Sequence, residues 1–204
     1  MHKVFISFHH DNDQDYKDYL SSIAEPFKVF IDKSVEIGDI DENDSDETIR
    51  QLIRDEYLKD STVTIVLVGT ETRNRKHVDW EIFSSMYDGQ KNKKSGILAI
   101  QLPSVTPVYY HAGHGTDEKT LYPAQKWVSI SDDEYDRRYP FVPPRIMDSV
   151  KKNVPISIIR WDDVINNNEY HLGFSKLKSF IDLADRDKEN CDYDFSRPRF
   201  GRNR

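Results

Sequence analysis

Glu81 is the residue of this chain whose type and position are most suggestive of chemistry. It follows a strand-like run at 62–68 and a polar loop at 69–76, and it lies directly after Trp80 in the first turns of a helix-like segment at 77–86. In an open α/β sheet, active sites collect where strands end and such helices begin. A carboxylate held there beside an aromatic ring could act on a charged ligand.

Outside this segment, few patterns carry chemistry. His111 and His114 lie near Asp117 in a glycine-containing stretch, but these three side chains are a weak signal for a metal site. No phosphate-binding sequence of the P-loop type occurs, and no G-x-G-x-x-G follows the first strand. We therefore expect no metal and no dinucleotide cofactor held in the Rossmann manner.

The composition is that of a polar globular chain. Its 204 residues are 37% hydrophobic and 32% charged, with a net charge of −7, which gives no general footprint for nucleic acid. The single cysteine, Cys191, excludes an intramolecular disulfide and fits a reducing cytoplasm. No stretch approaches the roughly 20 apolar residues of a membrane-spanning helix, and the first apolar run is too short for a signal peptide. We expect a cytoplasmic protein without nucleic-acid or membrane partners.

Strand-like and helix-like segments alternate along the first half of the chain and again near its end. Short β-rich runs predict strands at 4–8, 27–31, 62–68, 96–102 and 155–159. Capping signals and helical periodicity predict helices at 11–23, 44–57, 77–86, 145–153 and 177–184. This order predicts a flavodoxin-like, doubly wound α/β fold, in which helices cover both faces of a mostly parallel five-stranded sheet.

Residues 103–144 interrupt the alternation and are rich in proline, tyrosine, histidine and glycine. We interpret them as an ordered insertion, because aromatic residues at that density usually pack. The predicted organisation is a single domain at 1–184, with its core at 1–102 and 145–184. Residues 185–204 end in four arginines between Arg197 and Arg204, and we expect them to form a flexible, solvated tail.

Three motifs within residues 1–102 resemble the TIR domain family. The run Val4-Phe-Ile-Ser-Phe8, followed by His9-His-Asp-Asn-Asp13, is similar to the first family box, a strand that enters an acidic helix start. Gly38-Asp39-Ile40 lies where TIR domains carry a loop over their nucleotide pocket, and residues 72–82 resemble the signature that contains the glutamate. The longer C-terminal half, including Val142-Pro-Pro-Arg-Ile146, resembles the TIR-like proteins of the bacterial Thoeris anti-phage system.

The resemblance implies NAD+ chemistry. Catalytic TIR domains break the bond between nicotinamide and ribose, and some cyclise the ADP-ribose product into a messenger. In Thoeris, phage infection triggers the TIR protein, and its messenger activates a partner NADase. The chain is thus expected to be an NAD+ glycohydrolase or cyclic ADP-ribose-type synthase, with NAD+ as substrate and no cofactor. Because catalytic TIR domains often complete their pocket by assembly, a homo-oligomer is a further expectation.

The implied site has Glu81 as its catalytic residue. The implied substrate contacts are Ser7, Phe8, His9, Asp32, Lys33, Asp39, His77 and Trp80. A lone carboxylate suits this reaction, because nicotinamide leaves as a neutral molecule and the carboxylate can stabilise the developing ribosyl cation. Strand-end packing explains Phe8 equally well, and for His9 and Lys33 solvent exposure is the commoner outcome.

Other interpretations stay open. His77 stands where many TIR enzymes have tryptophan, and the covering loop lacks the usual arginine-aspartate-proline-glycine pattern, which favours a non-catalytic adaptor acting by assembly. A nucleoside deoxyribosyltransferase would also use a glutamate on a similar fold. Asp11 and Asp13 suggest a receiver-like phosphoacceptor, but the third strand is followed by Gly69 rather than by aspartate. Taken without the family, Glu81 is an ordinary helix-start carboxylate favoured by the helix dipole.

Overall fold

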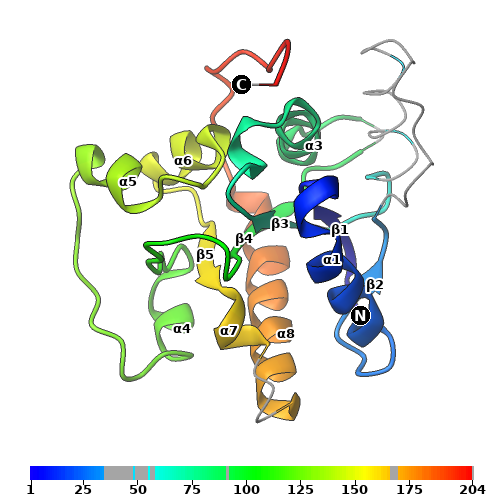
Figure 1. Cartoon of the computed structure of the whole chain (residues 1–204), viewed down its shortest axis with the longest axis vertical. Coiled ribbons are helices and arrows are strands. Elements are labelled where there is room, and N and C mark those ends of the chain that lie inside the picture. Colours follow the sequence, from blue (N-terminus) through cyan, green and yellow to red (C-terminus); the bar gives the residue numbers. More distant parts are fainter. Residues whose placement is uncertain (35–47, 49–54, 56–57, 91, 166–169, 204) are drawn as a thin grey trace.

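The computed structural model describes residues 1–34, 48, 55, 58–90, 92–165 and 170–203. Its centre is a parallel sheet of five strands in the order β2-β1-β3-β4-β5 (Figure 1). The strands are β1 Lys3–Ser7, β2 Ile31–Asp32, β3 Val63–Val68, β4 Gly96–Gln101 and β5 Ser157–Arg160. This confirms the predicted doubly wound α/β fold.

Helices of different length surround the sheet. The α-helices are α1 His10–Ala24, α3 Lys76–Met86, α4 Gly115–Lys119, α5 Asp132–Arg138, α6 Pro144–Lys151, α7 Trp161–Val164 and α8 Tyr170–Asp187. Two 3-10 turns, η2 Thr72–Asn74 and η3 Lys188–Asn190, complete the described elements. No described helix is both long and apolar enough to cross a membrane.

Alternate residues of the central strands feed two separate cores. Ile65 and Leu67 of β3 pack with apolar residues of α1 and α8, whereas Val66 and Val68 pack with those of α3 and α6. This is the pattern expected of a sheet that is buried on both faces, where successive side chains point to opposite sides. The face covered by α3 is the one that brings Glu81 to the sheet.

The second strand differs from its prediction. Only Ile31–Asp32 pairs with β1, while residues 27–30 form the turn after α1. The amides of Phe27 and Val29 still bond to carbonyls in the last turn of α1, and Lys28 has a φ of 54°. Helix termination therefore uses residues that their β propensity assigned to the strand. The predicted helix at 44–57 lies almost entirely outside the described residues.

The C-terminal residues are not the solvated tail that we expected. Helix α8 runs to Asp187, and beyond it Cys191, Tyr193 and Phe200 are buried. In Figure 1 this segment (red) returns to α3, and hydrogen bonds tie it there. Our prediction rested on the arginines. Cys191 and Tyr193 precede them and Phe200 lies among them, and burial of these apolar side chains holds the segment against the rest of the protein.

Candidate functional site

The candidate site lies at the topological switch of the sheet, between β1 and β3. From β1 the chain steps outward to β2, whereas β3 and the later strands extend the other way. Ligands of open α/β sheets bind at the carboxyl ends of the strands at such a point. Ser7 ends β1, and Glu81 belongs to α3, the helix after β3.

Ser7 and Glu81 form the central contact of the site. The Ser7 hydroxyl donates a hydrogen bond of 2.6 Å to Oε2 of Glu81, across 74 positions of sequence. Both residues are buried, Ser7 at 0% and Glu81 at 5% exposure. The structure thus brings together two of the residues that we predicted, through the pairing of β1 with β3 and the packing of α3 behind them.

Burial makes Glu81 an unusually weak acid. Loss of hydration raises the pKa of its carboxyl to about 8, and the hydrogen bond from Ser7 opposes this only in part. The group is therefore mostly protonated at neutral pH in the free protein. A cation that entered the site would favour the ionised form and draw the proton off.

A second buried carboxyl, Asp13, lies in the first turns of α1. The Thr72 hydroxyl lies 3.3 Å from its Oδ2 and 3.1 Å from the Leu67 carbonyl, and it accepts the Gly69 amide at 2.9 Å. Burial raises the pKa of Asp13, and its hydrogen bonds from Thr72 and the His9 backbone oppose the rise. These contacts anchor the loop that leads from β3 to α3. Our sequence interpretation did not include Thr72 in the site.

Gly69 is the sequence signal that could have revealed this anchor. A methyl group at Gly69 would lie 2.4 Å from one carboxylate oxygen of Asp13 and 2.6 Å from the other. Only glycine admits the carboxyl so close to the end of β3. The loop therefore requires a residue without a side chain at this position.

The residues after Ser7 have structural partners. His9 is the N-cap of α1, and its Nδ1 accepts the Asn12 amide, so α1 begins at His10, one residue before the predicted helix start. Burial, with Arg75 nearby, lowers the pKa of His9. Phe8 is buried and stacks on His10, with ring centroids 4.4 Å apart.

The predicted contacts near β2 do not meet Glu81 in any interaction that the structure shows. The Asp32 carboxylate accepts hydrogen bonds from Ser21 and Ser34, while the Lys33 side chain is exposed. Asp39 lies outside the described residues. At this edge, then, Asp32 joins α1 to the chain after β2.

His77 and Trp80 pack together on α3, with ring centroids 5.4 Å apart. The Trp80 ring is 2% exposed, its indole N–H donates to the Phe200 carbonyl at 2.9 Å, and the Lys76 ammonium lies 4.7 Å from its centroid. Trp80 thus contacts the C-terminal segment, and its buried ring is not an exposed surface beside Glu81.

With this geometry established, comparison with known families identifies the chain. A family model described as "Thoeris protein ThsB, TIR-like domain" matches residues 5–107, about half of the chain. The chain belongs to the ThsB TIR-like family. A search of curated proteins finds no match.

The family match covers the parts that build the site. It includes both Ser7 and Glu81, together with the end of β1 and the whole of α1, β3, α3 and β4. The resemblance inferred from the first box and the glutamate signature is confirmed. The residues that pack on the side of α3 opposite Glu81 lie outside the matched range.

The histidines of the insertion form a separate cluster. Nδ1 of His114 lies 2.7 Å from Oδ2 of Asp187, and Asp117 pairs with Arg186. Burial and the neighbouring His114 lower the pKa of His111 to about 4. Within the described ranges, no group of three His, Cys, Asp or Glu side chains has the arrangement of a metal site.

Proposed function

We propose that the chain is a TIR-like enzyme that cleaves NAD+ at the bond between nicotinamide and ribose. In the proposed pathway it makes a cyclic ADP-ribose-type messenger on phage infection, and the messenger activates a partner NADase in the same cytoplasm. The observation that carries the proposal is the buried Ser7–Glu81 pair at the switch point of the sheet. Membership of the ThsB TIR-like family supports the defence context.

The pair suits a substrate whose reacting end is cationic. The positive nicotinamide ribosyl group would favour ionisation of Glu81, which burial keeps protonated in the free protein. Ser7 would then hold the carboxylate through its hydroxyl. A site that ionises fully only with its cationic ligand bound has little free anion to attract metal ions or other cations.

Bond cleavage in this scheme needs one carboxylate. The C–N bond breaks with its electron pair on nicotinamide, which leaves neutral, and positive charge develops on the ribose. Glu81 would stabilise that charge electrostatically, and this effect is large in a buried site. Attack on the ribosyl cation by a nucleophile of the same ADP-ribose would close the ring and release a proton, whereas attack by water would give ADP-ribose.

The direct test compares Glu81→Gln with a matched variant, Glu118→Gln, in purified protein given NAD+ and extract of phage-infected cells. Glu118 is also buried, and burial raises its pKa to about 7, but it lies on α4. We expect Glu81→Gln to lose nicotinamide release by at least about 100-fold and Glu118→Gln to keep it. If Glu81→Gln released nicotinamide at the wild-type rate, the non-catalytic adaptor would be the better description.

A further inference from the structure

The outer side of α3 is held by a buried ion pair that the site described above does not use. Arg145 of α6 is 0% exposed, and its guanidinium grips the Asp79 carboxylate with two hydrogen bonds: Nε to Oδ1 at 2.9 Å and Nη2 to Oδ2 at 3.1 Å. The same guanidinium lies 5.1 Å from the centroid of the Phe83 ring. Asp79 and Phe83 therefore share one cationic partner.

These two residues lie on the far side of α3 from Glu81. Each is two positions from Glu81 in sequence, one before and one after, and two positions turn an α-helix by about 200°. Arg145 thus contacts the back of the same turns whose front presents Glu81 to Ser7. A shift of the back contact would move the carboxyl relative to β1.

A segment near the C-terminus makes further contacts with the same side of α3. We name residues 191–203 the C-terminal strap. Its Phe200 amide donates to Oδ2 of Asp79 at 2.9 Å, its Phe200 carbonyl accepts the Trp80 indole, and its Asn203 side chain accepts the Lys76 amide at 2.9 Å. The last contact provides an acceptor for an N–H group in the first turn of α3, where the helix itself offers none.

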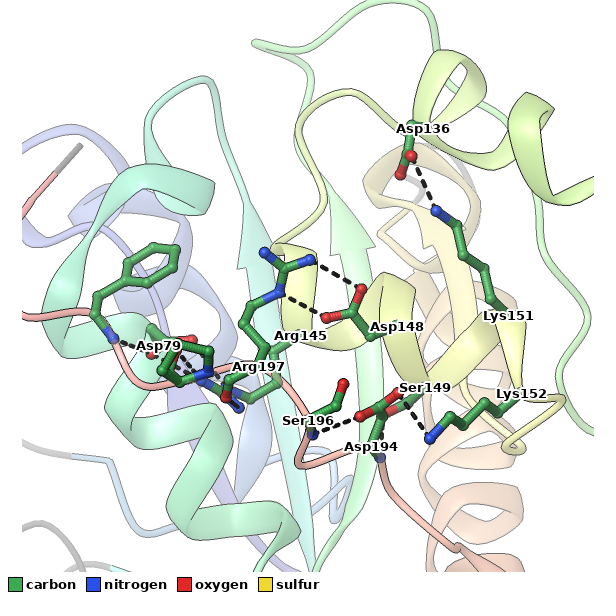
Figure 2. A network of polar contacts seen from close by, with 12 residues as sticks. Asp79, Asp136, Arg145, Asp148, Ser149, Lys151, Lys152, Asp194, Ser196 and Arg197 are labelled. Carbon is green, nitrogen blue, oxygen red and sulfur yellow. Dashed lines mark hydrogen bonds and ion pairs between the residues drawn. The ribbon is translucent and has the colours of Figure 1, made fainter.

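The strap is also fixed to α6. Arg197 makes a two-pronged pair with Asp148 at 2.6 and 3.0 Å, and the Asp194 amide donates to the Ser149 hydroxyl at 3.0 Å. Figure 2 shows the strap running between α3 and α6 with these contacts on either side. The carbonyls of Arg197 and Pro198 accept the remaining hydrogen bonds of Arg145, at 3.1 and 3.4 Å.

We propose that Arg145, Asp79 and the C-terminal strap are positioning elements that set where α3 places Glu81 against Ser7. The proposal rests on the proposed function for its effect on turnover, but its geometric part stands on the contacts alone. A buried ion pair is weak evidence of stabilisation, because desolvation offsets its attraction. The planar guanidinium, with two hydrogen bonds to one carboxylate (a fork), does specify one geometry, and lysine cannot reproduce it.

The decisive variant is Arg145→Lys, which keeps the charge and loses the fork. Its matched control is Arg160→Lys, which removes a similar two-pronged pair, with Asp163, at the end of β5 and outside both α3 and the strap. A gentler variant, Asn203→Ala, removes only the exposed cap on Lys76 and should fold in any case. Thermal unfolding of each variant is measured first, so that only folded protein is compared.

The readout that separates positioning from stability is the titration of Glu81, followed by NMR of protein labelled at glutamate side-chain carbons. In wild type the midpoint should lie near 8. If the back of α3 loosens, water reaches the carboxyl, so Arg145→Lys should move the midpoint toward the ordinary value of 4.5, and Asn203→Ala should move it less in the same direction. Arg160→Lys should leave the midpoint in place.

Turnover gives a second readout. A displaced Glu81 should lower kcat by about 10- to 100-fold with a small change in KM, because small misplacements of a reacting group act on the transition state. An unchanged Glu81 midpoint in folded Arg145→Lys, or an equal shift in Arg160→Lys, would overturn the positioning role. If Arg145→Lys does not fold, Asn203→Ala decides. Failure of the proposed function would look different, because the midpoints would shift as expected while wild type and Glu81→Gln gave the same nucleotide products.

Discussion

At the scale of single residues, the proposed cleavage of NAD+ depends on Glu81, a glutamic acid that is neutral when the site is empty. Burial raises the pKa of Glu81 to about 8, while Ser7 supplies the hydrogen bond that favours its ionised form. If the carboxylate is the reactive species, kcat/KM for NAD+ should rise with pH and level off above about 8, because this ratio reports ionisation in the free enzyme. A kcat/KM that fell over the same range would assign the reaction to the protonated acid.

Ser7→Ala should shift that profile to higher pH. The substitution removes a hydrogen bond that lowers the pKa of Glu81, so the free protein should hold its proton more tightly and kcat/KM at pH 7 should fall about 10-fold. Ser85→Ala is the control, because its hydroxyl donates to the Glu81 backbone carbonyl and not to the carboxyl. Equal profiles for the two variants would show that the Ser7 hydroxyl does not tune Glu81.

The same burial has a consequence for stability. Between pH 4.5 and about 8, Glu81 binds more protons in the folded than in the unfolded chain, so its contribution to the free energy of unfolding decreases as pH rises. Glu81→Gln has no proton to lose. It should therefore be more stable than wild type at pH 8 by about 2–4 kcal/mol and similar to it near pH 4. Urea unfolding at both pH values measures this, and a variant less stable than wild type at pH 8 would contradict it.

At the scale of elements, the loop from β3 to α3 is fixed by the close approach of Gly69 to Asp13. Gly69→Ala would place a methyl group 2.4 Å from a short, buried carboxylate that has little room to move. We expect the free energy of unfolding to fall by about 1–3 kcal/mol, as overpacking of a filled site does. Gly201→Ala, where an added methyl meets nothing within 4 Å, should have little effect in the same urea titration.

The elements also show where sequence reasoning succeeds and where it stops. Hydrophobic runs located β1, β3, β4 and β5, because buried strands read as continuous apolar segments. The run at 27–31 misled, since Lys28 adopts a positive φ and the amides there bond back to α1. Strand propensity is a local property of the residues, and it does not show that these amides are hydrogen-bonded to the end of a helix.

At the scale of the whole molecule, the long-range contacts were the part that the sequence could not supply. Glu81 stood out from its place after a strand, but its contact with Ser7 depends on parallel pairing between segments 74 positions apart. Trp80 was expected beside the ligand, and nothing in the sequence indicated that its indole N–H bonds to the Phe200 carbonyl, 120 positions away. No local sequence pattern predicts that the arginine-rich C-terminal residues pack on α3.

The measurement that tests the central claim most directly is a nucleotide profile of phage-infected cells that carry either wild-type protein or Glu81→Gln at matched protein levels. If Glu81 is catalytic, wild-type cells should accumulate a cyclic ADP-ribose-type nucleotide with free nicotinamide after infection, and both signals should be absent with Glu81→Gln. Equal amounts of the nucleotide in the two strains would contradict a catalytic role for Glu81.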